Sequence, residues 1–529
     1  MSKGRERSNM AMTVNRRSIL KSAAAVGALA VTSSGGILPA MAQESTSNKG
    51  GHFKLGVAAG ATSDSLDPGT YTNTFTEVFG KSLHGYLTEI DAEGKLTGEI
   101  AESWEASKDA KTWTFKLRQG VEFHNGKSLD ADDVIASINY HHREESKSAA
   151  KSIVEAIDDI RADGPGAVVI SLKNGNADFP YILEDFHLAI VPAKDGKADI
   201  SGVGAGGYVL ENIDYGVKGT AKRFANYWKT NAAWFDSIEL LSIQDATART
   251  NALTTGQIHA MERCDLKTVH LLERNKGLEI VSVGGTQHYT MPMHCDVSPF
   301  DNLDVRLALK YAIDRKQLLD TLLRGYGQLG NDHPIASTNR FFNKNLPQRE
   351  YDPEKAKFHL KKAGLADLKV SLSASDAAFP GGVDAAVIYQ QNAAKAGITI
   401  DVAREPSDGY WDAVWLKKPF CLSQWAGRPT ADWMFSQVYA ADAAWNDSHW
   451  KNARFNELLL SARSELDDAK RLEMYSEMQT LCSDDGGAII PVFANYVSAL
   501  SRKVGHSKIA SNWDLDGFRC TERWWFAEA

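Results

Sequence analysis

The chain has 529 residues, of which 43% are hydrophobic, and a formal charge of −8 at pH 7. A chain of this length can bury a sizeable core and is expected to divide into two or three domains. Its negative charge argues against nucleic-acid binding, which needs a basic surface. After the first 42 residues, no stretch is apolar over the roughly 20 residues that span a bilayer, so any association with a membrane requires a partner.

The first 42 residues are typical of an export signal. Arg16 and Arg17 stand in the sequence N-R-R-S-I-L-K, which resembles the twin-arginine motif. A weakly apolar run at 23–31 follows, and A-M-A at 40–42 provides a small-x-small cleavage site. Because this segment contains six basic residues and one acidic residue, its removal changes the formal charge from −8 to about −13. We therefore expect a mature protein in the periplasm.

The N-terminal third of the mature chain alternates strand and helix signals. Residues 52–58 predict a strand, a Gly/Ser/Asp-rich loop follows, and 75–83 predict a helix. Residues 111–117 alternate apolar and polar side chains, which predicts a half-buried strand. Ser128 or Asp130 can cap a helix that starts near residue 131.

Later segments repeat this mixture of strands and helices. The segment around Val305 to Ile313 places apolar residues at helical spacing, which predicts an amphipathic helix with one core face. Another helix is predicted after Asp352, with Asp352 as N-cap, proline at the first helical position and Gly364 just past the end. The remaining predicted elements are strands at 167–172, 238–243 and 488–492, and helices at 246–254, 455–466 and 469–481.

Five cysteines are widely spaced and form no C-x-x-C motif, which disfavours structural zinc. An oxidising compartment permits disulfides, and the odd number leaves at least one thiol free if the others pair. We consider two pairings as hypotheses, Cys295 with Cys421 and Cys482 with Cys520.

Several catalytic and cofactor motifs occur only in part. Residues 202–207 satisfy G-x-G-x-x-G, but a strand-like run follows where a dinucleotide site needs a helix. The S-x-x-K sequence at 148–151 lacks its companion motifs, and the chain has no G-x-S-x-G and no H-E-x-x-H. His141 and His142 are adjacent and point to different sides of a helix. We therefore expect no enzyme activity, no cofactor and no bound metal.

A longer pattern is more informative. The sequence S-L-D-P-G-T-Y, which begins at Ser65, is followed by L-T-E-I-D-A-E-G-K-L and then by T-W-T-F-K-L-R-Q-G-V-E-F-H-N-G-K-S-L-D-A-D-D-V. This order of motifs resembles the signature of the periplasmic solute-binding proteins of peptide/nickel-type ABC importers, the family of the oligopeptide- and dipeptide-binding proteins (extracellular solute-binding family 5). The Y-W pair at 227–228 and the segments 246–260, 299–315 and 351–364 also match.

The resemblance implies an α/β, two-lobed periplasmic binding protein fold of class II, in the large cluster that carries an extra subdomain, with the ligand cleft between the lobes. On this basis we expect an N-terminal lobe at 43–287, with an inserted subdomain at about 84–200. The second lobe would span 288–495, and 496–529 would return to the first lobe. The two hinge crossings are expected near 287–292 and 491–496.

The resemblance also implies a function. The protein would capture a peptide, or a peptide-like or carboxylated small solute, and deliver it to an ABC permease in the inner membrane, acting as a monomer. Opine-like, metal-chelate and haem-binding receptors share this fold and remain alternatives. A periplasmic chaperone or a hydrolase is a more distant alternative.

The segment S-Q-W-A-G-R-P-T-A-D-W at 423–433 is the best candidate for ligand contact. In peptide-binding relatives the matching tryptophan packs along the ligand, and an aspartate three residues later pairs with its α-ammonium group. Trp425 matches, but Arg428 occupies the aspartate position, so the ligand is expected to present an anionic or strongly hydrogen-bond-accepting group there. Asp432 can substitute for the aspartate if the turn is longer. Other residues that match cleft-facing positions are Tyr71, Thr72, His288 and Tyr289.

Overall fold

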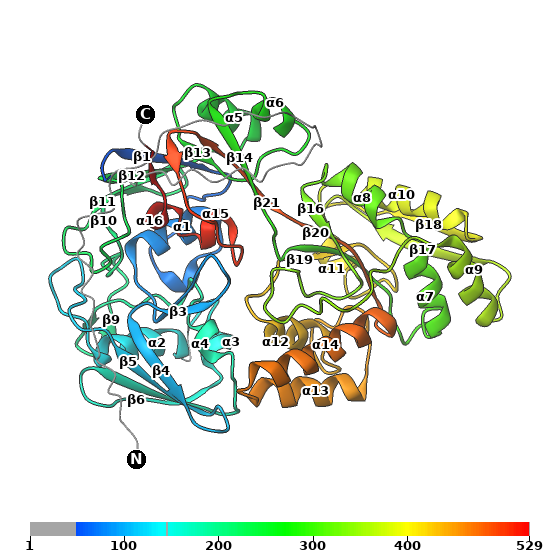
Figure 1. Cartoon of the computed structure of the whole chain (residues 1–529), viewed down its shortest axis with the longest axis horizontal. Coiled ribbons are helices and arrows are strands. Elements are labelled where there is room, and N and C mark those ends of the chain that lie inside the picture. Colours follow the sequence, from blue (N-terminus) through cyan, green and yellow to red (C-terminus); the bar gives the residue numbers. More distant parts are fainter. Residues whose placement is uncertain (1–48, 144–145, 528–529) are drawn as a thin grey trace, which may run out of the picture. The chain divides into compact units, whose positions relative to one another are not determined.

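The computed structural model describes residues 49–143 and 146–527 (Figure 1). The predicted signal segment, residues 1–42, lies outside the described residues. The described chain forms two lobes, each built around its own β-sheet. No helix in this part of the chain is long and apolar enough to cross a membrane.

The first lobe contains a seven-stranded sheet in the order β10-β11-β12-β1-β13-β21-β14. Strand β1 (His52–Val57) runs parallel to its neighbours β12 and β13, and the other pairings are antiparallel. Alternate side chains of β1, Phe53, Leu55 and Val57, are fully buried, as expected for a strand with one face in a core. The other strands are β10 (Tyr208–Asp214), β11 (Lys218–Arg223), β12 (Ser237–Ser242), β13 (Ala260–Met261), β14 (Leu278–Val283) and β21 (Tyr496–Ser501).

Helices and short strands cover this sheet. Helix α1 (Thr74–Leu83) begins at Asn73, whose side chain accepts a hydrogen bond from the amide of Thr76. The C-terminal residues return to the same core, where Trp524 is almost fully buried. The remaining elements are η1 (Pro68–Thr70), α5 (Ala246–Thr254), α6 (Val269–Glu273), β22 (Val504–Gly505), α15 (Asp514–Gly517), α16 (Cys520–Arg523) and β23 (Trp525–Phe526).

A subdomain of the first lobe has a separate antiparallel sheet in the order β4-β5-β7-β6 and its own core. Helix α2 (Ala131–His142) packs on this sheet, and Asp130 and Asp133 form a reciprocal capping box at its start. The strands are β4 (Ala101–Ala106), β5 (Thr112–Leu117), β6 (Ile157–Ala162) and β7 (Ala167–Leu172). Smaller elements are β2 (Thr88–Ile90), β3 (Leu96–Gly98), α3 (Lys151–Val154), α4 (Phe179–Ile182), β8 (Ala193–Lys194) and β9 (Lys197–Ala198).

The second lobe contains an antiparallel sheet in the order β16-β20-β15-β19 and a parallel pair, β17 and β18. Its strands are β15 (His288–Pro292), β16 (Gly327–Leu329), β17 (Leu368–Ala374), β18 (Ile398–Arg404), β19 (Ser423–Trp425) and β20 (Ala488–Ala494). Its helices are α7 (Leu303–Tyr311), α8 (Arg315–Leu322), α9 (Pro353–Lys362), α10 (Gly382–Ala394), α11 (Tyr410–Ala413), α12 (Ala431–Met434), the π-helix η2 (Phe435–Tyr439), α13 (Ala453–Ser464) and α14 (Asp468–Asp484).

The chain crosses between the two sheets at residues 284–287 and at Asn495 (Figure 1). The predicted first crossing, 287–292, falls mainly on β15, so the crossing lies a few residues earlier. The crossings touch, because the amide of Ala494 donates to the carbonyl of Gln287 at 2.9 Å. At Gly285 a Cβ atom would lie 2.4 Å from the carbonyl oxygen of Ala494, so only glycine allows this approach.

Both proposed disulfides are wrong. All five cysteines are unpaired in the structure. Cys482 lies in a core of the second lobe whereas Cys520 lies in the core of the first lobe, so these two cannot meet. Cys295 and Cys421 also pack against different apolar clusters. Burial raises the pKa of all five thiols, to about 11 for Cys295, which favours the neutral, unreactive form.

Candidate ligand-binding cavity

A cavity of about 530 Å³ lies between the lobes beside the two crossings. Ligand pockets typically enclose about 300–1,000 Å³, so its volume suits a small organic solute. The first lobe contributes Thr74, Glu77, Arg263, Trp513, Asp514 and Phe518 to the wall. The second lobe contributes Tyr289, Leu323, Pro380, Gln424 and Ala426, and the first crossing contributes Gln287.

A side branch of about 360 Å³ adjoins this cavity. It shares Cys264, Leu266, Tyr289, Leu323 and Pro380 with the main cavity, so the two spaces are neighbours. The branch also has two acidic and two basic residues on its wall, Asp265, Lys267, Arg324 and Asp384. An extended solute can therefore reach beyond the main cavity.

Strand register decides which second-lobe side chains face the cavity. In the β15–β19 pairing, Tyr289 is opposite Gln424, and both line the cavity. The Tyr289 ring stacks on Phe379 with a centroid distance of 4.1 Å. The side-chain amide of Gln287 donates to the side-chain oxygen of Gln424 at 2.7 Å, so the polar groups of this wall are held in place.

His288 and Trp425 form the next opposed pair in the same two strands, and neither lines the cavity. Because successive side chains of a strand point to opposite faces, both are directed into the second lobe. His288 is fully buried, which lowers its pKa to about 4. The indole of Trp425 donates to the carboxylate of Asp447 at 3.2 Å. Sequence reasoning placed both residues in the cleft, whereas the structure places them in the adjacent core.

The two candidates from the first lobe also lie away from the cavity wall. Tyr71 is buried in the core, where its hydroxyl donates to the carbonyl of Leu66 at 3.1 Å. Its ring occupies the space beside Gly80. Thr72 is exposed and lines neither the cavity nor its side branch.

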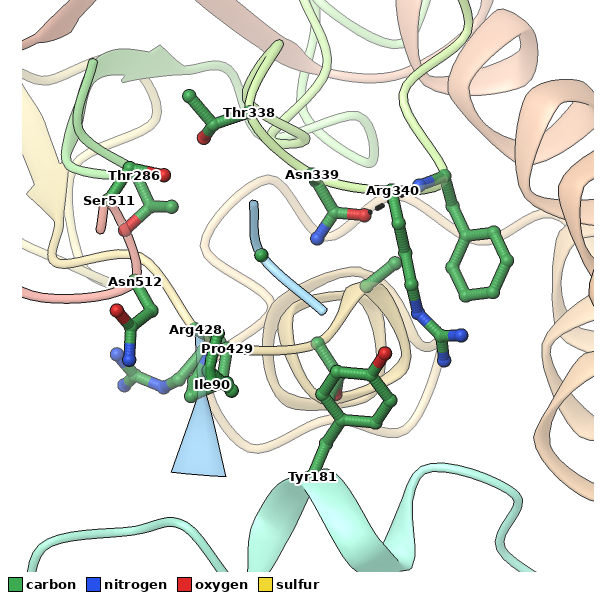
Figure 2. Close-up of a pocket in the computed structure, with 14 residues that line it drawn as sticks. Ile90, Tyr181, Thr286, Thr338, Asn339, Arg340, Arg428, Pro429, Ser511 and Asn512 are labelled. Atoms are coloured by element: carbon green, nitrogen blue, oxygen red, sulfur yellow. Dashed lines mark hydrogen bonds between the residues drawn. The ribbon is translucent and has the colours of Figure 1, made fainter. Parts of the chain in front are cut away.

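Arg428 lines a separate, smaller pocket of about 40 Å³, shown in Figure 2. This pocket is also bounded by both lobes, and Figure 2 shows Arg428 of the second lobe and Asn512 of the first lobe among the side chains that line it. The guanidinium donates to the carbonyl of Ala426 at 2.7 Å and to the side-chain oxygen of Gln437 at 2.6 Å. Burial lowers the pKa of Arg428, and the charge of Asp185 opposes this shift.

Asp432 is buried and already paired. Its carboxylate accepts a hydrogen bond from Arg463 at 3.1 Å. Burial raises the pKa of Asp432 to about 6 despite this partner. The structure therefore gives Asp432 an internal partner and does not place it on the cavity wall.

The charged residues of the main cavity were missed by sequence reasoning. Glu77, Arg263 and Asp514 come from three distant parts of the chain, and no local motif links them. Burial, together with the charge of the neighbouring Glu262, raises the pKa of Glu77 to about 8 and that of Asp514 to about 7. The fold alone brings these groups together.

One cluster outside the cavity contains potential metal-binding side chains. Donor atoms of His294, Asp296 and His449 lie within 4.8 Å of one another. The two imidazole rings stack, however, with a centroid distance of 3.8 Å and planes only 19° apart. Nearly parallel rings direct their lone pairs side by side and not toward one point, so this arrangement does not form a coordination site.

Two lobes joined by two adjacent crossings, with a cavity between them, define a periplasmic-binding-protein fold. The sequence matches the model of the bacterial extracellular solute-binding proteins, family 5, over residues 95–447. The chain belongs to this family, and its function is that of the substrate-binding component of an ABC importer. The predicted family, fold class and class of function are thereby confirmed.

Comparisons with individual proteins agree with this assignment. The glutathione-binding protein GsiB of Escherichia coli (strain K12) is 27% identical over 464 residues, which cover 85% of this chain and 90% of GsiB. The structure of DppA from Helicobacter pylori in complex with the peptide STSA matches with a TM-score of 0.72 and 23% identity, over 91% of this chain and 99% of DppA. HbpA2 from Haemophilus parasuis matches with a TM-score of 0.79 and 20% identity, over 88% and 99%. At these identities the two structures establish the fold.

Proposed function

We propose that this protein captures a small peptide-like or otherwise carboxylated solute in the periplasm and delivers it intact to an inner-membrane ABC permease. The observation that carries the proposal is the cavity of about 530 Å³ bounded by both lobes beside the crossings. A solute in this cavity contacts Gln424 and Tyr289 on one side and Phe518 and Trp513 on the other.

Such contacts explain how binding is signalled to a permease. A solute that touches both lobes favours the arrangement in which the lobes are close together, and so shifts the population toward the closed state. The crossings at 284–287 and Asn495 are the only covalent links between the two sheets in the described chain, and the first contains Gly284 and Gly285. Short links of this kind can absorb the rotation of a hinge.

The choice of a peptide-like solute is supported by the relatives. GsiB is named for glutathione, and the DppA structure contains a tetrapeptide. Another structural neighbour, AgaA from A. tumefaciens R10, was solved with agropinic acid, which keeps an opine-like solute as the alternative. The cavity walls combine aromatic and amide side chains, which suits a solute with both apolar and hydrogen-bonding parts.

Ala426 lines the main cavity, and Arg428, two residues further along the chain, lines the smaller pocket. We assign to Arg428 the reception of an anionic group of the solute. Its Nε and Nη1 atoms are held by Gln437 and by the carbonyls of Ala426 and Gly427, which fixes the orientation of the guanidinium. The Nη2 atom makes no hydrogen bond within the described chain, and it remains available to a carboxylate. Asn512 of the first lobe lines the same pocket and can share this group.

The protein is proposed to act as a monomer and without catalysis. The thiol on the cavity wall, Cys264, has its pKa raised to about 12 by burial, so it is a poor nucleophile at neutral pH. The hydroxyl of Tyr289 is also held in its neutral form, since burial raises its pKa to about 12. These groups suit recognition of a solute better than its chemical conversion.

Native mass spectrometry of protein purified from its own periplasm tests this proposal. We expect one small solute per chain, released intact on denaturation. Small-angle scattering should show a smaller radius of gyration when the released solute is added back. Gln424→Ala should weaken binding about 5- to 10-fold, since it removes one hydrogen-bonding group, whereas the exposed control Lys369→Ala should not. Recovery of a converted product would overturn the proposal.

A further inference from the structure

All charged side chains on the wall of the main cavity belong to the first lobe. They are Glu77, Arg263 and Asp514, and the second-lobe wall is neutral. Two carboxyl groups therefore face one guanidinium. The side branch has as many acidic as basic side chains, so the excess of carboxyl groups over basic side chains is confined to the main cavity.

The carboxyl groups of this wall have few hydrogen-bond donors in the described part of the chain. Glu77 is half-buried, and within the described chain its carboxylate has no hydrogen bond and no ion pair. Asp514 is nearly buried, and its Oδ1 atom accepts from the amide of Leu515 at 2.7 Å and, weakly, from Ser498. Its Oδ2 atom has no protein donor in the described chain. Buried carboxylates normally have several donors, so this wall is unusual.

A third carboxyl group, that of Glu262, acts on both of these, since, in addition to burial, its charge raises the pKa of each. Glu262 is 0% exposed, and its Oε1 atom accepts from the amide of Ala58 at 2.7 Å. Its Oε2 atom is buried without a hydrogen-bond donor, and its nearest cation is Nε of Arg263 at 3.4 Å. The side chain of Arg263 is 63% exposed, so solvent screens its charge. The buried Arg249 also lies near Glu262, since burial lowers the pKa of Arg249 and the charge of Glu262 opposes this shift. Two arginines therefore accompany three neighbouring carboxyl groups.

We propose that the solute carries a basic group, and that this group sits between Glu77 and Asp514 on the first-lobe wall of the cavity. An ammonium or guanidinium group supplies the donors that both carboxyl groups lack, and charge-assisted hydrogen bonds of this kind are the strong ones. This inference rests on the proposed function, because it names the chemistry of the solute in the same cavity. It also places the cation on the lobe opposite to Arg428.

The same arrangement couples binding to proton release. With pKa values raised to about 8 and about 7, Glu77 is mostly protonated and Asp514 about half protonated at pH 7. Besides Glu262 and Arg263, the groups that act on Glu77 are His187, which lowers its pKa, and Asp185, which raises it.

For Asp514, the other groups that act on the carboxyl are the amide of Leu515 and the hydroxyl of Ser498, both of which lower its pKa. Tyr496 also lies near both acids and stays neutral, since its pKa is raised to about 12. A bound cation favours the ionised carboxylates, so it displaces their protons. Affinity for a cation should therefore rise as the pH increases from 6 to 8.5.

The experiment uses matched probes. Trialanine is compared with N-acetyl-trialanine, and agmatine and putrescine serve as cations without a carboxylate. The two amines keep their charge from pH 6 to 8.5, since amine groups of this type titrate near pH 10. Calorimetry on the mature protein in two buffers of different ionisation enthalpy counts the protons released.

We expect trialanine to bind at least 10-fold more tightly than N-acetyl-trialanine. Whichever of agmatine and putrescine binds should gain about 10-fold in affinity between pH 6 and 8.5. Glu77→Gln keeps the size of the side chain and should remove most of both effects, with an unchanged melting temperature. Asp514→Asn is the second variant. Glu105→Gln, an exposed position of the first lobe, is the control and should behave as wild type.

The other outcomes distinguish failure of this inference from failure of the proposed function. Equal binding of trialanine and N-acetyl-trialanine, or an endogenous solute that lacks any basic group, overturns the inference and leaves the proposed function standing. Absence of both a retained solute and binding by every probe overturns the two together. A retained solute with a basic group, lost in Glu77→Gln but not in Glu105→Gln, supports both.

Discussion

The carboxylate of Asp178 in the first lobe accepts a hydrogen bond from Arg340 of the second lobe at 2.7 Å, and Asp178 is only 1% exposed. Its second oxygen lies 2.8 Å from Arg471, which is also buried. A backbone hydrogen bond from Ala177 to the carbonyl of Arg463 lies beside them. The lobes are therefore linked by the ion pairs of the buried Asp178 with Arg340 and Arg471, as well as by the two crossings.

Asp178→Asn should destabilise the protein by about 3–5 kcal/mol, because it leaves Arg471 buried without its carboxylate. Arg340→Gln should cost less, about 1 kcal/mol, since the Arg340 side chain is 27% exposed and its other partner, Asp468, lies at the surface. Urea unfolding of both variants at pH 7 measures the difference. Equal losses of unfolding free energy in the two variants would contradict the view that Arg471 is the arginine whose buried charge needs Asp178.

Asp447 should make stability depend on pH. Burial raises its pKa in the folded protein to about 6, above the usual value of 3.8, although the indoles of Trp415 and Trp425 donate to it. The folded state therefore binds this proton more tightly than the unfolded state, so the contribution is fully present below about pH 4 and is lost as the pH rises through 6. Because a shift of one unit corresponds to about 1.4 kcal/mol, the effect is at most about 3 kcal/mol.

Asp447→Asn imitates the protonated acid, since its amide oxygen can accept from both indoles. The variant should be more stable than wild type at pH 8 and should lose the dependence between pH 4 and 6. Unfolding midpoints in urea at pH 5 and pH 8 test this, with the exposed Asp401→Asn as the control. A variant that is less stable than wild type at pH 8 would show that the ionised form is the one the fold favours.

Local elements with clear end signals could be predicted from sequence. The strand at 167–172 and the helix at 246–254 have the predicted bounds. The helix after Asp352 also has its predicted cap, because the Asp352 side chain accepts from the amides of Glu354 and Lys355. In each case the residues that mark the end of the element lie within a few positions of that end.

The site could be predicted only in part, since it depends on relations between distant segments. Tyr289 lines the cavity, whereas its neighbour His288 faces the core. A shift of one residue reverses the face on which every residue of a strand lies. Trp425 follows the same rule, so Gln424 takes its place on the wall. Glu77 and Asp514 line the same cavity only because the C-terminal segment returns to the first lobe.

Export is predicted to require both Arg16 and Arg17, because the twin-arginine motif is read as a pair. These residues lie outside the described part of the chain. Replacement of both by lysine should abolish the mature periplasmic form, and cell fractionation with an antibody to the protein measures this. A single Lys21→Arg change is the control, since it keeps the pair intact. Normal export of the double variant would assign the protein to the general secretion route.

Arg428→Ala should weaken binding of the solute recovered from the periplasm by about 30-fold, because it removes a partly buried charged partner of an anionic group. Arg428→Lys should recover only part of this loss, since an ammonium lacks the planar fork of the guanidinium. Both variants also lose the hydrogen bonds to Ala426 and Gln437, so melting temperatures must be measured beside calorimetric affinities. Arg404→Ala, at an exposed position of the second lobe, is the control. A lower melting temperature with unchanged affinity in Arg428→Ala would show that Arg428 only holds the turn that follows Trp425.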